Sequence, residues 1–285
     1  MRVRGEAINI ERGGSKASWH GPKFREKRGQ SVNKLEPGTA HLWVADLASV
    51  DERTVEDYRI LLSEEELDRA QRFRFQRDRL SFVVSHGLLR TALTWLAPGN
   101  RPEDWIFAMG ANGRPEINMP DTVPWPRFNI SHTAGSVACV VTAEIDCGVD
   151  VESVRPLPDL EALSRRVLTP TERAHIAALP DDERLCSFFR LWTLKEAYAK
   201  ARGLGVLLSF ERLCFEWNEG GIRLDIDPVL DDGAQWYFDQ WQAPPGYMLS
   251  VALRRGAEGF REMVHHTALP LRPHCSRRRR QTGSN

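Results

Sequence analysis

The sequence lacks the features by which membrane, secreted and zinc-binding proteins are most easily identified. No apolar run approaches the roughly 20 residues that a membrane-spanning helix needs, and residues 1–14 contain no apolar segment typical of a signal peptide. The five cysteines form no C-x-x-C pair and no other spacing typical of a zinc site. We therefore expect a protein of the reducing cytoplasm, with no membrane partner.

A net charge is also absent, since 39 Lys and Arg residues balance 39 Asp and Glu residues. This balance conceals two basic ends: residues 1–34 hold nine basic and three acidic residues, and residues 271–285 hold five arginines and no acid. Because both ends lack hydrophobic periodicity, residues 1–36 and 263–285 are predicted to be disordered tails. The run Arg277–Arg280 could contact nucleic acid, but we favour an unstructured tail and expect no nucleic-acid partner.

Between these ends, the same arrangement of elements occurs twice. Ser63 and Thr169 each begin a capping box, in which a Glu three residues later bonds back to the start of the helix. The 106-residue offset between them also pairs Phe82 with Phe188. Each half shows a short helix, a longer helix and then strands. The sequence thus predicts an α+β fold with a pseudo-two-fold repeat of two similar α/β halves, residues 37–145 and 146–262, and a site in the cleft between them.

One predicted strand of the second half carries two acidic residues. Asp150 and Glu152 are two residues apart, so both carboxylates point to the same face of the strand. The strand, Cys147–Glu152, is expected to pair with Val137–Thr142 as a hairpin. Adjacent carboxylates repel each other unless a cation or a base lies between them, and a set of oxygen ligands suits Mg²⁺ or Mn²⁺. The alternative is an exposed strand edge that happens to carry two acids.

The helix predicted over Arg184–Arg202 offers a third carboxylate. Glu196 and Lys200 lie one turn apart, on a different side from its apolar stripe. Taken alone, they fit an ordinary ion pair on a solvated face. If Glu196 reaches the acidic strand, however, three carboxylates meet and phosphoryl chemistry becomes plausible. The 106-residue offset makes Arg90 the counterpart of Glu196, so acidic chemistry is expected in the second half alone.

Residues upstream are better suited to binding an anion than to nucleophilic catalysis. Ser131 and His132 lie in no G-x-S-x-G motif, and adjacent residues seldom form a catalytic pair. Both side chains are good donors to a phosphate. The turn Gly113-Arg114-Pro115 supplies a guanidinium but lacks the lysine of a P-loop. The arginines between Arg69 and Arg79 fit a solvated helix face, from which one or two could serve a phosphate.

Taken together, these motifs resemble the signature of the 4′-phosphopantetheinyl transferases. The chain has Gly148-Val149-Asp150-Val151-Glu152, and Trp192-Thr193-Leu194-Lys195-Glu196-Ala197-Tyr198-Ala199-Lys200 follows. It is also similar to the larger, Sfp-type branch of the family at Gly113-Arg114-Pro115, at Phe128-Asn129-Ile130-Ser131-His132 and at Pro245-Gly246-Tyr247. The resemblance covers residues 40–255, and Arg114 departs from the commoner Lys while keeping its charge.

The resemblance implies an enzyme that moves the phosphopantetheine arm of coenzyme A onto a serine of an apo acyl or peptidyl carrier protein. It implies two α+β halves in one chain, with the CoA site between them, and we expect a monomer. By the family pattern, Asp150, Glu152 and Glu196 hold Mg²⁺, for which Mn²⁺ could substitute, and Glu196 and Lys200 are catalytic. The residues that match the family's CoA-binding positions are Arg69, Arg114, Pro115, Asn129, Ser131, His132, Lys195 and Lys200.

Two other classes of protein fit the same residues. One is a metal-dependent hydrolase that cleaves the CoA diphosphate with water, and the other is a CoA-binding protein without catalytic activity. A complete set of three carboxylates argues against the second class, because a copy that had lost its activity would be expected to lose a ligand. Nothing in the sequence selects a carrier protein or a pathway.

Overall fold

The computed structural model describes residues 35–110, 112–120, 125–243, 246–256, 259–266 and 269–270. Most of the predicted tails, residues 1–36 and 263–285, lies outside these ranges, including residues 1–34 and 271–285. The first half begins with β1 (Thr39–Asp46) and continues into α1 (Glu52–Arg59), α2 (Glu64–Gln71) and α3 (Gln76–Leu96). The short strands β2 (Phe107–Met109) and β3 (Pro115–Ile117) follow. This half ends with β4 (Arg127–Thr133) and β5 (Ser136–Thr142).

The second half repeats this order of elements. It begins with β6 (Cys147–Ser153), and the helices α4 (Leu160–Val167), α5 (Pro170–Ala178) and α6 (Asp181–Arg202) follow. The hairpin of β7 (Leu213–Asn218) and β8 (Gly221–Ile226) precedes β9 (Trp236–Gln242) and β10 (Tyr247–Arg254). A last strand, β11 (Glu262–His266), has no counterpart among the described residues of the first half.

Corresponding strands occupy corresponding places in the two main sheets. The first sheet has the order β11-β1-β5-β4 and the second has the order β6-β10-β9. The pairs among β1, β5 and β4, and those among β6, β10 and β9, are all antiparallel. The predicted repeat of two α/β halves is therefore confirmed. The predicted pairing of β5 with β6 is wrong, because residues 143–146 carry the chain from one sheet to the other.

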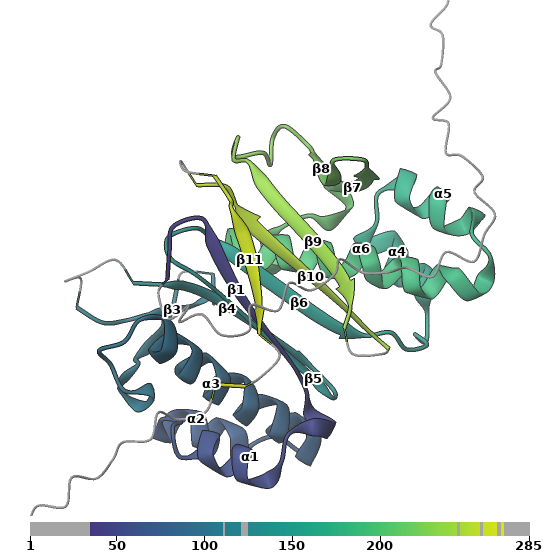
Figure 1. Cartoon of the computed structure of the whole chain (residues 1–285). Coiled ribbons are helices and arrows are strands. Elements are labelled where there is room, and N and C mark those ends of the chain that lie inside the picture. Colours follow the sequence, from purple (N-terminus) through teal and green to yellow (C-terminus); the bar gives the residue numbers. More distant parts are fainter. Residues whose placement is uncertain are drawn as a thin grey trace, which may run out of the picture.

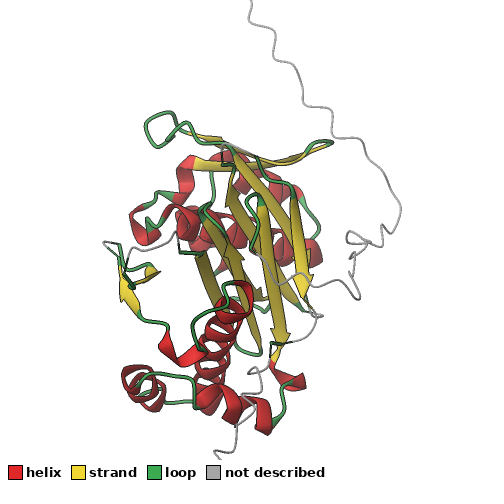
Figure 2. Cartoon of the chain, turned by 60° about the vertical axis from the view of Figure 1, so that its left-hand side comes forward, coloured by secondary structure: helices red, strands yellow, loops and turns green. Residues whose placement is uncertain are grey.

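The two sheets pack against each other, and the helices cover their outer faces (Figures 1 and 2). Side chains from β1, β5, β6 and β10, such as Leu42, Val140, Val149 and Val251, fill the space between the sheets. Separate buried clusters lie under α1–α3 and under α4–α6. In the part of the chain that the structure describes, no helix combines the length and apolarity that crossing a membrane requires.

Both predicted capping boxes are present, and each capping glutamate also binds a cation from the long helix that follows. Glu66 accepts from Arg90 at 2.8 Å, and Glu172 accepts from Lys195 at 2.5 Å. Arg90 is therefore the structural counterpart of Lys195. The predicted correspondence between Arg90 and Glu196 is wrong by one residue, because the second half is one residue shorter between its capping box and this position.

Residues 263–266, predicted to begin a disordered tail, belong to β11. This strand pairs with β1 in parallel, from Thr39 opposite Glu262 to Trp43 opposite His266. The ring of His266 stacks on Trp43 with 4.1 Å between centroids, and its Nε2 lies 3.0 Å from Nδ1 of His41. These contacts explain why β11 is ordered although its sequence shows no long apolar alternation.

Candidate active site

The backbone of α6 lies very close to β6 at Gly148. A Cβ at this position would lie 2.0 Å from the carbonyl oxygen of Ala197 and 2.6 Å from the amide nitrogen of Ala201. Because heavy atoms cannot approach so closely, only glycine allows this contact. The glycine therefore places the helix directly against the strand that carries Asp150 and Glu152.

Lys200 connects α6 to the acidic strand and to β4. Its Nζ donates to Oδ1 of Asp150 at 2.7 Å, to Oγ of Ser131 at 3.0 Å and to the carbonyl oxygen of Val149 at 3.2 Å. These acceptors account for all three N–H groups of the ammonium. The two predicted motifs thus meet at the junction of the two halves, and Lys200 lies at their point of contact.

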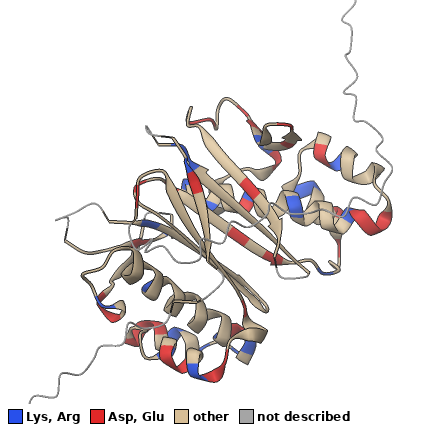
Figure 3. Ribbon diagram, viewed as in Figure 1, with Lys and Arg blue, Asp and Glu red and all other residues tan. Residues whose placement is uncertain are grey.

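The three carboxylates share one electrostatic environment. Burial raises the pKa of Glu196, and the negative charges of Asp150 and Glu152 raise it further, whereas Lys200 lowers it. Burial is also the main cause of the raised pKa of Glu152, and the charge of Asp150 is the second. Figure 3 shows acidic segments along β6, between the two groups of helices. The charge of Asp150 therefore acts on both glutamates of the site.

This donor set fits a divalent cation. Oδ2 of Asp150 is buried and has no hydrogen-bond partner among the described residues, and a buried oxygen of this kind needs a donor or a metal. In the described ranges, no three Asp, Glu, His or Cys side chains already enclose a metal-sized position. Mg²⁺ does not require such a cage, because it commonly binds through one or two carboxylates, water and substrate phosphates. The types of donor present therefore suit Mg²⁺ beside a phosphate-bearing substrate.

Polar side chains of β4 lie along the outer edge of β6. Oδ1 of Asn129 accepts from the N–H of Val149 at 2.9 Å. Oγ of Ser131 accepts from the N–H of Val151 at 3.3 Å and donates to Asp150 at 3.0 Å. Asn129 was predicted to contact CoA. In the structure its side-chain oxygen instead accepts a hydrogen bond from within the protein. Ser131 stays at the site, shared between Asp150 and the ammonium described above.

Thr133 continues this row and was not predicted. Its Oγ1 donates to Oε2 of Glu152 at 3.3 Å. The period of two that links Asn129, Ser131 and Thr133 along a strand was visible in the sequence and could have identified it. Arg155 also lies near Glu152, with 3.7 Å between Nη1 and Oε2, but it is exposed and the separation is long.

His132 and Arg69 lie on the first-half side of the site. Desolvation lowers the pKa of His132, and Lys200 and Arg69 lower it further against the opposing charge of Asp78. The imidazole is therefore held neutral near pH 7 and can donate one hydrogen bond. Arg69 is exposed, and its guanidinium lies over the ring of Phe82 at 5.5 Å. The predicted contacts of both residues with CoA stay predictions.

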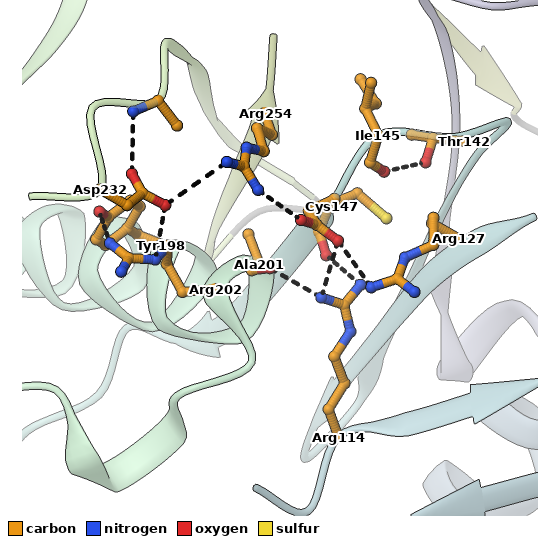
Figure 4. Close-up of polar contacts among 12 residues, drawn as sticks. Arg114, Arg127, Thr142, Ile145, Cys147, Tyr198, Ala201, Arg202, Asp232 and Arg254 are labelled. Carbon is orange, nitrogen blue, oxygen red and sulfur yellow. Dashed lines mark hydrogen bonds and ion pairs between the residues drawn. The ribbon is translucent and has the colours of Figure 1, made fainter. Parts of the chain in front are cut away.

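Arg114 lies at the other end of the β6 edge (Figure 4). Its Nη1 donates to the carbonyl oxygen of Ala201 at 2.8 Å, its Nη2 donates to that of Cys147 at 3.4 Å, and Asp146 lies 3.7 Å away. Only 9% of its side chain is exposed. Through these hydrogen bonds, the guanidinium links the β2–β3 hairpin to the second half. Its predicted contact with CoA, and that of Pro115 at the start of β3, stay predictions.

Lys195 lies away from the site, and its predicted contact with CoA is contradicted. Its Nζ donates to Glu172 at 2.5 Å, to the carbonyl oxygen of Val167 at 2.9 Å and to that of Phe210 at 3.0 Å. The side chain is 0% exposed. A ligand could reach this ammonium only if the packing between α6 and α5 opened, so its role is structural.

The chain matches the sequence model of the 4′-phosphopantetheinyl transferase superfamily over residues 146–252. It is 36% identical over 166 residues to the 4′-phosphopantetheinyl transferase HetI of a Nostoc species. This alignment covers 58% of this chain and 69% of the relative. It is 26% identical over 196 residues to the 4′-phosphopantetheinyl transferase Sfp of Bacillus subtilis, which covers 69% of this chain and 84% of the relative.

The solved structures that match the chain cover a smaller part of it. A holo-(acyl-carrier-protein) synthase from Bacillus anthracis in complex with CoA (3′,5′-ADP) matches 39% of this chain and 96% of its own, at 19% identity and a TM-score of 0.34. The holo-[acyl-carrier-protein] synthase of Thermotoga maritima matches 39% of this chain and 63% of its own, at 21% identity and a TM-score of 0.32.

Proposed function

Because the chain belongs to the 4′-phosphopantetheinyl transferase superfamily, we propose that it transfers the 4′-phosphopantetheine group of coenzyme A to a serine of apo acyl or peptidyl carrier proteins. The match with Sfp, together with two α/β halves in one chain, assigns it to the Sfp-type branch. The observation that carries the site is the contact of Lys200 with Asp150, at 2.7 Å, where the two halves meet.

In the proposed reaction, the serine oxygen of the carrier forms a bond with the β-phosphorus of CoA. The bond from that phosphorus to the bridging oxygen breaks, and the oxygen leaves as part of adenosine 3′,5′-bisphosphate. Charge moves onto the leaving phosphate, so fixed positive charge nearby lowers the barrier. Lys200 is the cation in the best position, because its present partners, Ser131 and Asp150, lie at the junction itself.

Glu196 is proposed as the base that accepts the serine proton. Burial and the neighbouring carboxylates raise its pKa, which moves the group toward the range in which a general base works well. It lies one turn before Lys200 on α6, so base and phosphate contact come from the same helix face. A glutamine at this position would keep the shape but could not accept the proton.

Asp150, Glu152 and Glu196 are proposed to hold Mg²⁺, for which Mn²⁺ could substitute. When bound, the ion supplies positive charge next to the CoA diphosphate. The unpartnered Oδ2 of Asp150 and the raised pKa values of the other two carboxylates support this assignment. Ser131, His132 and Arg69 are proposed to contact CoA from the first half, so that CoA lies between a half that binds it and a half that holds the metal.

We also propose that the protein acts as a monomer in the cytoplasm. Four cysteines in the described ranges, Cys139, Cys147, Cys186 and Cys214, are free thiols, which suits a reducing compartment. The arrangement of both halves in one chain means that no second copy is needed to complete the junction described above.

The test is incubation of the full chain with CoA, Mg²⁺ and a panel of apo carrier proteins, followed by intact-mass measurement of each carrier. The proposal predicts a mass gain of one phosphopantetheine on at least one carrier, with an equal amount of adenosine 3′,5′-bisphosphate. Cleavage of CoA in the absence of a carrier would identify a hydrolase. Binding of CoA with neither product would identify a non-catalytic CoA-binding protein.

A further inference from the structure

The two halves meet along β4 and β6, yet these strands belong to different sheets and share no backbone ladder. The outer edge of β6 would then be left with unpaired backbone groups in the interior, which is costly. Side chains take the place of the missing strand: Asn129 and Ser131 accept from the N–H groups of Val149 and Val151. Across the junction, side-chain oxygens of β4 thus accept the hydrogen bonds of these two backbone N–H groups of β6.

Asn129 differs from its neighbour Ser131 in what it contacts. Ser131 is bonded to both Asp150 and Lys200 and so belongs to the site itself. Asn129 accepts a hydrogen bond from the backbone N–H of Val149 in β6, and the residue is 7% exposed. A buried amide in this position has little surface to offer a ligand.

The residue held by Asn129 immediately precedes Asp150. The N–H of Val149 is bound by Asn129, while its carbonyl oxygen accepts from Lys200 at 3.2 Å. Val149 itself is 0% exposed. The backbone here is therefore held by a residue from each half, and Asp150 projects from it. A shift of this part of the strand would move the carboxylate directly.

We propose that Asn129 is a positioning residue that sets the place of Asp150 across the junction and does not contact CoA. The inference rests on the proposed metal site. If Asn129 is lost, the buried N–H of Val149 has no acceptor, and β6 must shift or admit water to satisfy it. Outer partners that orient metal ligands affect metal affinity strongly, although they never touch the ion.

Two variants test this role. Asn129→Leu keeps a similar volume without an acceptor, and Asn129→Ala removes the side chain. Mn²⁺ affinity is measured by titration calorimetry, and adenosine 3′,5′-bisphosphate affinity is measured separately without metal. We expect Mn²⁺ binding to weaken on the order of ten- to a hundred-fold, while metal-free binding of the bisphosphate is unchanged. In the transfer assay kcat falls and the KM for CoA stays the same.

The control is Thr91→Val, which removes a buried hydroxyl that donates within α3 to the carbonyl oxygens of Gly87 and Leu88. It tests general destabilisation of the first half and should leave Mn²⁺ affinity at the wild-type value. If metal-free bisphosphate binding falls in the Asn129 variants while Mn²⁺ binding persists, Asn129 is a CoA contact and the proposal is overturned.

Amide hydrogen exchange gives a readout that depends on neither metal nor activity. In the wild-type protein the N–H of Val149 should be protected, and Asn129→Leu should speed its exchange selectively over amides at the centre of β10. Equal protection in both proteins would overturn the proposal. If the variants do not fold, slower exchange at Val149 on addition of Mg²⁺ to the wild type supports it, and no change contradicts it. Failure of the wild type to bind Mn²⁺ would instead refute the metal site, and the exchange result would still decide the role of Asn129.

Discussion

Replacing Lys195 by methionine tests whether this lysine has a structural role or binds the substrate. The ammonium is 0% exposed and is bonded to Glu172 at 2.5 Å and to the carbonyl oxygens of Val167 and Phe210. Methionine has a similar length but no charge, so the variant leaves a buried carboxylate without its cation. Breaking one side of a buried ion pair costs about 3–5 kcal/mol.

The contacts of Glu172 place the expected cost near the lower end of this range. Its Oε2 accepts from the N–H of Thr169 at 2.8 Å, and its Oε1 accepts from the N–H of Phe215 at 3.0 Å. Both bonds survive in Lys195→Met and continue to stabilise the carboxylate. We therefore expect a loss of about 3 kcal/mol in the free energy of unfolding, with a fall in Tm on the order of 10 °C.

The assay is urea unfolding followed by tryptophan fluorescence, together with the KM for CoA in the transfer reaction. Stability should fall while the KM for CoA is unchanged, and Lys195→Met combined with Glu172→Gln should recover part of the stability because no buried charge is left unpaired. A variant of wild-type stability with a raised KM for CoA would refute the reasoning and return Lys195 to the CoA site.

Three further predictions follow from the same contacts. Lys200→Met should weaken CoA binding roughly tenfold or more, because it removes a charged donor; equilibrium binding of CoA measures this, and unchanged affinity would exclude the proposed phosphate contact. Gly148→Ala should destabilise the protein by at least about 1–3 kcal/mol, because its methyl group would overlap the α6 backbone; a Tm equal to that of the wild type would show that the helix can move away. The pKa values of His41 and His266 are lowered by burial from 6.5 to about 4. Between these values the unfolded state binds protons that the folded state does not, so stability is full above pH 6.5 and falls as the pH drops toward 4, by on the order of 3 kcal/mol for the buried His41; denaturant midpoints from pH 7 to 5 measure the slope, which should flatten in His41→Phe.

The parts of the fold that depend on local chemistry were predictable from the sequence. A capping box is defined by two residues three apart, so both helix starts were found, and the repeat of these boxes exposed the two halves. The common direction of Asp150 and Glu152 followed from the period of a strand. The pairing partners of β5 and β6 could not be predicted in this way, because β5 is buried throughout and β6 is buried from Cys147 to Val151, so neither shows an alternation of buried and exposed residues that selects its neighbour.

The helical spacing of Lys195 indicates that this residue is buried, whereas a match to the family motif does not. It lies four residues after Leu191 and three before Tyr198, and therefore on the apolar stripe of α6 rather than on the side of Glu196 and Lys200. Its partner Glu172 lies 23 residues away in the sequence, on a different helix. Helical spacing could predict the burial, whereas only the packing of α5 on α6 could reveal the ion pair.

The most direct test of the central claim is intact-mass analysis of an apo carrier protein after incubation with CoA and Mg²⁺, comparing the wild type with Glu196→Gln and Asp150→Ala. The wild type is predicted to add one phosphopantetheine to the carrier serine, and both variants are predicted to leave the carrier unmodified while keeping the wild-type Tm within a few degrees. Full modification of the carrier by folded Glu196→Gln and Asp150→Ala would contradict the proposed site.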